Sequence, residues 1–182
     1  EDADVAAYPY DPEKAKALLA EAGYGDGLTL NFTASAGWGD IGCQIAAENL
    51  RQVGIDVNFE VVDPTIWGDR YYGGDYDLCF SGEADMYLDP DFLSLSYGTG
   101  GGYNQYYYSD ADVDKLLAQA HVETDEKTRE VLYHQAIAII KEAAPVVPLY
   151  YTAYGNACVE NLEGYEPGIG IVYNYFYDIY YK

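Results

Sequence analysis

The sequence predicts an α/β fold with a mostly parallel sheet flanked by helices. A strand, a helix and a second strand are expected in succession over residues 28–62. A strand–helix–strand unit of this length is nearly always a right-handed crossover between parallel strands. A short helix and a third strand are expected over residues 64–72 and 76–80, and they continue the α/β alternation.

The segment before this unit predicts a helix. Asp11 is a suitable N-cap, Pro12 fits the first helical position, and Gly23 ends the helix. Apolar residues recur at helical spacing and are expected to form one buried stripe. These residues are Ala15, Leu18, Leu19 and Ala22.

The first strand alternates apolar and polar residues over 28–34, which predicts a half-buried strand. A glycine-rich turn with Trp38 leads into a helix over residues 40–53, which Gly54 ends. The second strand is expected over residues 55–62.

Regular periodicity is lost from residue 81 to residue 109, and loops of this length in compact domains are usually functional. Two amphipathic helices follow, with Ser109 and Thr124 as candidate N-caps, and Pro145 stops the second. Residues 146–159 are expected to be extended. The tail over residues 171–181 is predicted to be a strand with large aromatic residues on both faces. We therefore expect other parts of the protein to pack against both of its faces.

Composition excludes some classes of protein. The chain has 9 Lys and Arg against 31 Asp and Glu, a formal net charge of −22, so nucleic acid is a poor partner. The ordinary interpretation of this charge is a solvated acidic surface. The three cysteines lack CxxC spacing, which excludes a zinc site and a closed disulfide framework and predicts buried free thiols.

Five segments, in order along nearly the whole chain, resemble the peptide/nickel-type solute-binding proteins of ABC transporters (family 5). They are YDPEKAKALL at 10–19, GIDV at 54–57, GDYDL at 74–78, YSDADVDKLL at 108–117 and APVVPLYY at 144–151. The resemblance implies a periplasmic-binding-protein-like lobe of type II, taken from a longer, two-lobed protein. Residues 1–145 would then be the C-terminal, ligand-binding lobe, and residues 146–182 a crossover returning toward the first lobe.

The resemblance also implies a ligand site in residues 82–90. Peptide-binding members often carry Gly-Trp-x-Ala-Asp-Tyr-x-Asp-Pro there, and the first Asp accepts the amino group of the peptide. In this chain Glu83 replaces the Trp, Asp85 lies one residue early, and Tyr87 aligns. We expect these three residues to contact the ligand, with Asp85 as the partner of a ligand amine.

Four further residues are candidate ligand contacts. Tyr103, Asn104 and Tyr106 flank a glycine-rich loop that approaches the ligand in the family, and tyrosine rings with polar tips suit peptides, sugars and protein surfaces alike. Trp38 follows the first strand, and open α/β sheets bind ligands at the carboxyl ends of their strands. Packing beneath the loop is the alternative role for Trp38.

Two acidic patterns have simpler interpretations than catalysis or metal binding. The spacing of three aspartates, Asp110, Asp112 and Asp114, resembles the start of an EF-hand calcium loop. The glycine and the glutamate that such a loop requires further on are missing, which favours the N-terminus of a helix instead. Asp89 and Asp91 with Asp85 could serve a glycosidase, but Asp-Pro-Asp is ordinary turn chemistry. We therefore expect no enzyme, no cofactor and no metal site.

The predicted function is the solute-binding component of an ABC transporter, with an oligopeptide or dipeptide as ligand. The expected partners are a small peptide or other small solute and, through the full-length protein, a membrane permease. The protein is expected to be monomeric and extracytoplasmic, as a cell-surface lipoprotein or in the periplasm. Two alternatives stay open, an oligosaccharide receptor of the same family and a surface interaction domain without a transport role.

Overall fold

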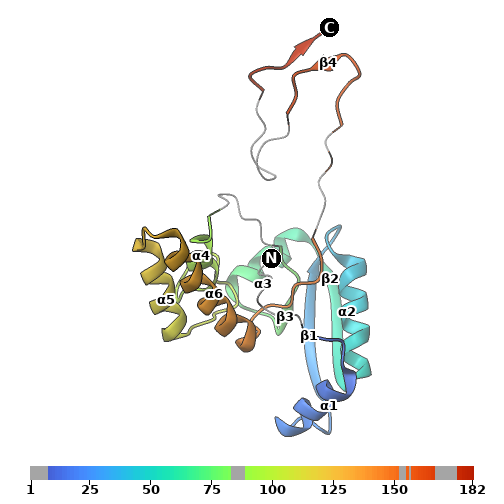
Figure 1. The fold of residues 1–182 in the computed structure, drawn as a ribbon. Helices are drawn as coiled ribbons and strands as arrows, with labels where there is room; N and C mark the ends of the chain where they lie inside the picture. The colour runs from blue at the N-terminus through green and yellow to red at the C-terminus, as the bar shows by residue number, and fades with distance from the viewer. Residues whose placement is uncertain (1–7, 83–88, 152–154, 156, 167–175) are drawn as a thin grey trace.

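The computed structural model describes residues 8–82, 89–151, 155, 157–166 and 176–182. Its main sheet has three parallel strands in the order β2–β1–β3, with bounds β1 Leu28–Ser35, β2 Ile55–Val62 and β3 Leu78–Cys79 (Figure 1). β1 and β2 pair along their whole length, from Leu28↔Ile55 to Ser35↔Val62. The predicted parallel α/β arrangement is confirmed, although β3 is shorter than expected.

Helices cover both faces of this sheet. α2 (Asp40–Gln52) lies on one side and α3 (Pro64–Gly73) on the other (Figure 1). The core under α2 contains Phe32, Ala34, Cys43, Ala47 and Val57. On the α3 side, Arg70 donates to the Thr33 hydroxyl at 3.3 Å.

The carboxyl half of β1 corrects the prediction of a half-buried strand. All four residues from Phe32 to Ser35 are buried, including the polar Thr33 and Ser35. β1 is the central strand and has a helix on each face, so neither set of alternating side chains reaches solvent there. Polar alternation in the sequence therefore did not mark a solvent-facing side.

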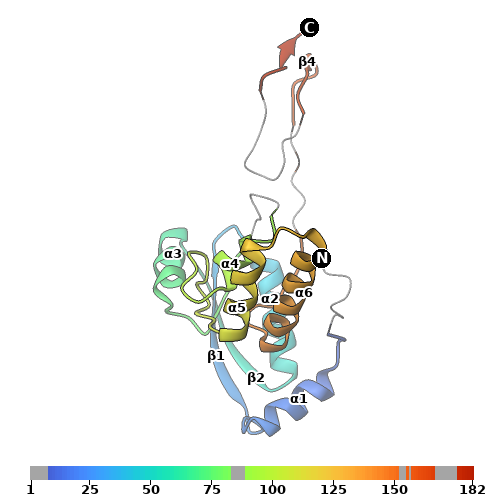
Figure 2. The ribbon, with the colours of Figure 1, turned by 60° about the vertical axis from the view of Figure 1, so that its left-hand side comes forward.

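The first helix, α1 (Pro12–Glu21), begins as predicted, with the Asp11 side chain accepting from the Lys14 amide at 2.9 Å. Its predicted buried stripe is wrong, because no residue of α1 is buried and Leu18 is 54% exposed. The helix lies beyond the amino ends of the strands and not on a sheet face (Figure 2). The apolar stripe thus has no sheet to pack against.

A helical unit follows the sheet, made of α4 (Phe92–Tyr97), α5 (Ala111–Val122) and α6 (Glu126–Ala143). Its core is separate from the core of the sheet, since the two clusters share no residue. The buried residues of this second core are Tyr97, Val113, Leu117, Ala120, Tyr133, Ala136 and Ile140. The prediction of two amphipathic helices is confirmed, because α5 and α6 each bury one face in this core.

The N-caps of these helices correct the predictions. Asp110, not Ser109, caps α5 by accepting from the amides of Asp112 and Val113. Asp125, not Thr124, caps α6 by accepting from the Thr128 amide at 2.9 Å. A carboxylate also carries a negative charge that the helix dipole favours, so aspartate wins over the neighbouring hydroxyl.

The C-terminal part forms no further strand of the main sheet among its described residues. β4 (Leu162–Glu163) pairs antiparallel with β5 (Tyr180–Tyr181), and this hairpin stands apart from the sheet in Figures 1 and 2. Tyr177 is 98% exposed, so the cover expected on both faces of the tail is missing in the described residues 176–182. Residues 171–175 of the predicted strand lie outside the described residues.

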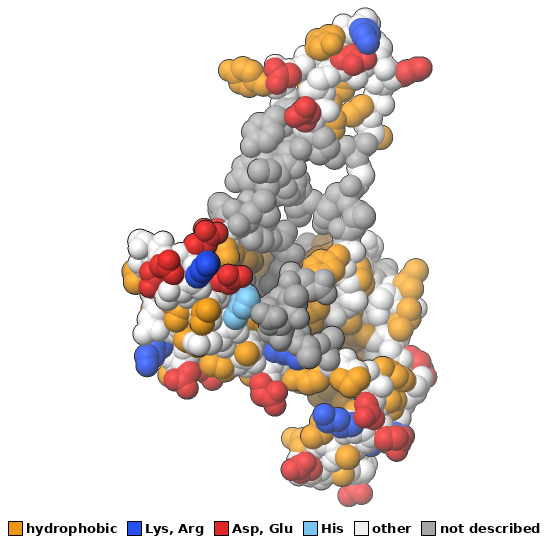
Figure 3. Space-filling view, in the orientation of Figure 1, with side chains coloured by type: hydrophobic (Ala, Val, Ile, Leu, Met, Phe, Trp, Pro, Cys, Tyr) orange, Lys and Arg blue, Asp and Glu red, His pale blue; other side chains and the backbone are white. Residues whose placement is uncertain are grey.

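Figure 3 shows scattered acidic side chains among apolar ones on the visible face, with fewer basic side chains. This distribution fits the net charge of −22. None of the described helices has the length and apolar character needed to cross a membrane.

The three cysteines differ in exposure. Cys43 is buried, as predicted, but Cys79 is only half-buried. Cys158 is exposed, because it lies near the hairpin and away from both cores. Burial raises the pKa of the Cys79 thiol to about 11. None of the three cysteines forms a disulfide bond in the structure.

These exposures predict unequal reactivity toward a thiol reagent such as DTNB at about pH 8. The thiolate is the reacting form, so Cys79 should react slowly and the inaccessible Cys43 only on unfolding. We expect one fast equivalent, which Cys158→Ser abolishes and Cys79→Ser leaves intact. Three equal rates in the native protein would contradict this assignment.

Candidate functional site

Three aromatic side chains meet at the carboxyl edge of the sheet. Trp38 follows β1, Trp67 lies in α3 after β2, and Phe80 follows β3. The Trp38 ring lies edge-on to both others, with centroid distances of 5.6 Å to Trp67 and 5.2 Å to Phe80. Carboxyl ends of parallel strands share one edge, so the topology itself gathers these three rings.

Two tyrosines extend this group, and we call all five rings the aromatic cluster. Tyr71 stacks on Trp67 at 4.8 Å, and Tyr150 on Phe80 at 6.2 Å. The Trp67 indole N–H donates to the Phe80 carbonyl at 3.0 Å, which fixes the α3 side of the cluster to the end of β3. Tyr150 comes from the predicted crossover segment, which therefore reaches the edge of the sheet.

Glycines allow the close packing around these rings. Gly39 has a φ of +78°, and a Cβ there would lie 2.2 Å from the Phe80 ring. A Cβ on Gly82 would lie 2.8 Å from Cζ2 of Trp38. The chain leaving β3 therefore passes directly against Trp38, and the stretch of residues 82–90 begins at the aromatic cluster.

The predicted ligand residues divide into two groups. Glu83, Asp85 and Tyr87 lie outside the described residues, so their roles stay predictions. Trp38 is at the carboxyl edge as expected, and it is 41% exposed. Its ring packs against other rings and also keeps a solvent-accessible surface, so both of the roles considered for it agree with the structure.

The loop residues Tyr103, Asn104 and Tyr106 have contacts within the loop and the helical unit. The Asn104 side chain donates to the carbonyls of Gly98 (2.9 Å) and Tyr108 (2.7 Å). It also accepts from the Tyr108 amide, and only 9% of the residue is exposed. These bonds hold the loop in shape, and the ligand-contact role of Asn104 stays a prediction.

The two tyrosines of this group pack on α4. Tyr103 lies 5.5 Å from the Phe92 ring, and Tyr106 stacks on Tyr97 at 5.6 Å. The loop reaches the sheet through Tyr76, whose hydroxyl donates to the Gln105 carbonyl at 2.7 Å. Burial raises the pKa of Tyr76 to about 12, so this donor stays protonated well above neutral pH.

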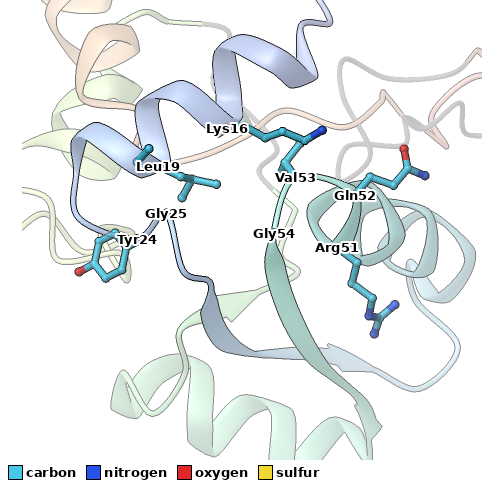
Figure 4. A pocket seen from close by; sticks show the side chains of 9 residues that line it. Lys16, Leu19, Tyr24, Gly25, Arg51, Gln52, Val53 and Gly54 are labelled. Atoms are coloured by element: carbon cyan, nitrogen blue, oxygen red, sulfur yellow. The ribbon is translucent and has the colours of Figure 1, made fainter.

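A pocket of about 400 Å³ lies at the opposite, amino edge of the sheet, between α1 and the start of β2 (Figure 4). Its two cations, Lys16 and Arg51, are paired with Glu13 and Glu48 and point in different directions. Arg51 also donates to the Val57 carbonyl at 2.7 Å. The cations do not converge on one point, so the pocket is not built to hold an anion.

The sequence prediction missed four members of the aromatic cluster. Trp67 and Tyr71 were expected to be ordinary helix residues, Phe80 a strand residue and Tyr150 an extended one. The signal for Trp67 and Phe80 was present, because Trp67 closely follows a predicted parallel strand and Phe80 ends the next one. The Tyr150 contact depends on the path of the returning chain, which no local pattern encodes.

The acidic residues considered for catalysis or metal binding have structural roles wherever the structure describes them. Asp89 accepts from the Asp91 amide at 2.9 Å, which is turn chemistry, and Asp110 caps a helix. Within residues 8–82, 89–151 and the described C-terminal parts, no group of His, Cys, Asp and Glu is placed to hold a metal ion.

A family model, described as bacterial extracellular solute-binding proteins, family 5 Middle, matches residues 1–105. The match covers more than half of the 182 residues. The chain therefore belongs to this family of solute-binding proteins.

Individual relatives are similar over most of the chain. Di/tripeptide-binding protein 2 of Pseudomonas aeruginosa (strain UCBPP-PA14) is 32% identical over 176 residues, 90% of this chain and 32% of that protein. The periplasmic murein peptide-binding protein MppA of Escherichia coli (strain K12) is 31% identical over 157 residues, 84% of this chain and 29% of that protein. The chain thus spans about a third of the length of these relatives.

Solved structures agree with the fold. The periplasmic binding protein DppA of Helicobacter pylori, in complex with the peptide STSA, has a TM-score of 0.76 and 30% identity over 82% of this chain and 30% of that one. HbpA2 of Haemophilus parasuis has a TM-score of 0.79 at 24% identity over 100% of this chain and 38% of that one, a likeness of fold alone. The predicted periplasmic-binding-protein-like lobe of type II is confirmed.

Proposed function

We propose that this chain is the peptide-binding lobe of an ABC-transporter receptor and binds its ligand at the carboxyl edge of the sheet. The observation that carries the proposal is the aromatic cluster there, with residues 82–90 leaving directly from it. Family relatives are named for di- and tripeptides, murein peptide and oligopeptide. The protein acts as a receptor and not as an enzyme.

The chemistry of this edge suits a short peptide. Exposed indole and phenol surfaces bind apolar and aromatic side chains and attract cations. The acidic character of the protein favours a ligand with a free amino group over an anionic one. Asp85, in the stretch that starts at the cluster, is the proposed partner of that amine.

The lobe works as one half of a two-lobed receptor. Residues 1–145 form the ligand-binding lobe, and residues 146–182 return toward the other lobe. The exposed aromatic residues of the C-terminal hairpin fit such a return, because apolar surface of this kind is covered in a finished assembly. The receptor is extracytoplasmic, monomeric and delivers its ligand to a membrane permease.

Tryptophan fluorescence tests this proposal, since Trp38 and Trp67 both lie in the aromatic cluster. Di- and tripeptides should shift the emission of the full-length receptor saturably, and neutral oligosaccharides should not. A response to sugars alone would replace the peptide assignment by the oligosaccharide receptor. No change in emission with either peptides or oligosaccharides would favour the surface interaction domain.

Asp85→Ala should weaken peptide binding about tenfold or more, because a buried charge-assisted hydrogen bond is worth roughly 1.5–3 kcal/mol. In the unchanged protein, N-acetylation of the peptide should weaken binding by the same factor as Asp85→Ala does. In Asp85→Ala, N-acetylation should cause no further loss of affinity. Asp26→Ala, at an exposed turn near the amino edge, is the matched control and should bind normally. Equal affinity of Asp85→Ala and Asp26→Ala would refute the amine-binding role.

Gly39→Ala should disturb the aromatic cluster, because its Cβ would overlap the Phe80 ring. Gly37→Ala is a close control, since Gly37 has nearly the same φ (+77° against +78°) but nothing within 4 Å of an added Cβ. Both variants carry the same backbone strain, so only Gly39→Ala should change the tryptophan emission and near-UV circular dichroism. Identical spectra for the two would contradict the packing described here.

A further inference from the structure

A polar network joins the start of α4 to the last turn of α5 and the first half of α6. The Arg129 guanidinium, on α6, donates to Asp89 at 2.7 Å and to the Tyr133 hydroxyl at 3.1 Å. Nδ1 of His121, in the last turn of α5, lies 2.9 Å from Oδ2 of Asp91. We call these five residues the latch.

The contacts of the latch support one another. The two aspartates are linked, because Asp89 accepts from the Asp91 amide at 2.9 Å. The other oxygen of Asp91 accepts from Ser94 at 3.1 Å and faces the Tyr133 hydroxyl at 3.4 Å. Tyr133 is 3% exposed in the helical core, so the latch is fastened to a rigid element.

The latch also has a polar surface of its own. All of the latch except Tyr133 lines a pocket of about 340 Å³, together with Phe92 and Leu95. Hydrogen bonds from the Asp91 amide and from Arg129 hold the pKa of Asp89 below its usual range. The Asp89 carboxylate also raises the pKa of Arg129.

The position of the latch in the chain gives it a consequence for the ligand site. The stretch of residues 82–90 begins at the aromatic cluster, where Gly82 lies against Trp38 and Ser81 donates to the Tyr71 hydroxyl at 2.9 Å. The same stretch ends at the latch, where Asp89 binds Arg129. One end is thus attached to the sheet and the other to the helical unit.

We propose that Arg129 and His121 are positioning residues for ligand binding, because they fix Asp89 and Asp91 and so determine where the stretch of residues 82–90 ends. They touch no ligand themselves. This inference rests on the proposed ligand site in that stretch. A displacement of about 1 Å in a contacting group is enough to weaken a preorganised binding site. Releasing the carboxyl end of the stretch of residues 82–90 should therefore lower ligand affinity without removing any ligand contact.

A double-mutant cycle on Asp89→Asn and Arg129→Gln in the full-length receptor tests the pair, with a tripeptide as probe. Each single variant should bind about tenfold more weakly, and the double variant no more weakly than either, because both break the same bond. Arg129→Lys keeps a charged donor and should recover most of the affinity, which a purely packing role would not give. Additive losses, or affinity unchanged in both singles, would overturn the proposal.

His121→Gln should weaken binding less than Arg129→Gln, since His121 is bonded to Asp91 alone in the latch. Lys16→Gln is the control, because Lys16 forms an exposed ion pair with Glu13 at the opposite edge of the sheet. The control should bind as the unchanged protein does. A loss in Lys16→Gln equal to that in Arg129→Gln would mean that charge alone, and not the latch, governs affinity.

Hydrogen exchange separates failure of the latch from failure of the proposed function. Without any ligand, the amides of Asp91 and Phe92 should exchange faster in Arg129→Gln than in the unchanged protein. If no peptide binds but this difference appears, the ligand assignment is wrong and the latch stands. If peptide binds and the exchange is unchanged, the latch is wrong and the ligand assignment stands.

The lowered pKa of Asp89 gives the latch a defined pH dependence. An acidic group whose pKa is lower in the folded protein than in the unfolded chain stabilises the fold when the pH is above the unfolded-state pKa. This stabilisation is lost as the pH falls through the folded-state pKa. The unchanged protein should therefore be more stable to urea than Asp89→Asn at about pH 7, by a margin that reflects the ionised Asp89 carboxylate. Below about pH 4 the margin should shrink, and a margin that grows on acidification would contradict the ion pair.

Discussion

Replacing Phe32 with alanine is expected to lower the free energy of unfolding by about 3–5 kcal/mol, since removal of a buried ring leaves a cavity. Phe32 is 6% exposed and packs edge-on against Phe59, with centroids 5.3 Å apart. It also pairs with both neighbouring strands, with Phe59 on β2 and Leu78 on β3. Urea unfolding followed by far-UV circular dichroism measures the change.

Phe176→Ala is the matched control for this experiment, because the same side chain is 70% exposed near the C-terminus. Its loss should change the free energy of unfolding by less than about 0.5 kcal/mol. Phe32→Leu, which keeps most of the volume, should fall between the two if Phe32→Ala is too unstable to purify. Equal midpoints for Phe32→Ala and Phe176→Ala would refute the position of the core.

Gly101→Ala is expected to displace the glycine-rich loop, with a loss of about 1–3 kcal/mol in stability. A Cβ at residue 101 would lie 2.3 Å from the Leu95 carbonyl oxygen and 2.8 Å from that of Ser94. Both are backbone atoms, which cannot rotate aside as a side chain can. The loop carries Asn104 and its neighbouring tyrosines, so we also expect amide chemical shifts to change throughout residues 98–108.

The neighbouring glycine provides the control for the loop. Gly102 has nothing within 4 Å of an added Cβ, and Gly102→Ala should leave both stability and the loop spectrum almost unchanged. The two variants differ by one position in the same loop, so composition and chain entropy are matched. Similar damage from both would show that any side chain in this loop is harmful and that the Leu95 contact is not the cause.

The parallel sheet was predictable because its patterns are local. β2 was expected at its observed bounds, and Gly54 ends α2 with a φ of +96°, a conformation that glycine favours. The burial of Thr33 and Ser35 was not predictable in the same way. It depends on α3 packing against the second face of β1, and no pattern within β1 reports a helix that comes later in the chain.

The candidate site shows the same division. The rule for parallel strands correctly placed Trp38 at the carboxyl edge, and the same rule would have found Trp67 and Phe80. The latch was missed, since Asp89 and Arg129 are 40 residues apart in the chain. Asp91 was considered only as a turn residue or catalytic acid.

The two separate cores have a consequence for how the chain folds. The interior of the helical unit is assembled from residues within 97–140, whereas the sheet must align strands separated by crossovers. Loop closure makes such distant pairing slow, and local helical contacts form quickly. The helical unit should therefore gain amide protection first during refolding and act as a foldon, while the sheet is completed in a later, slower phase.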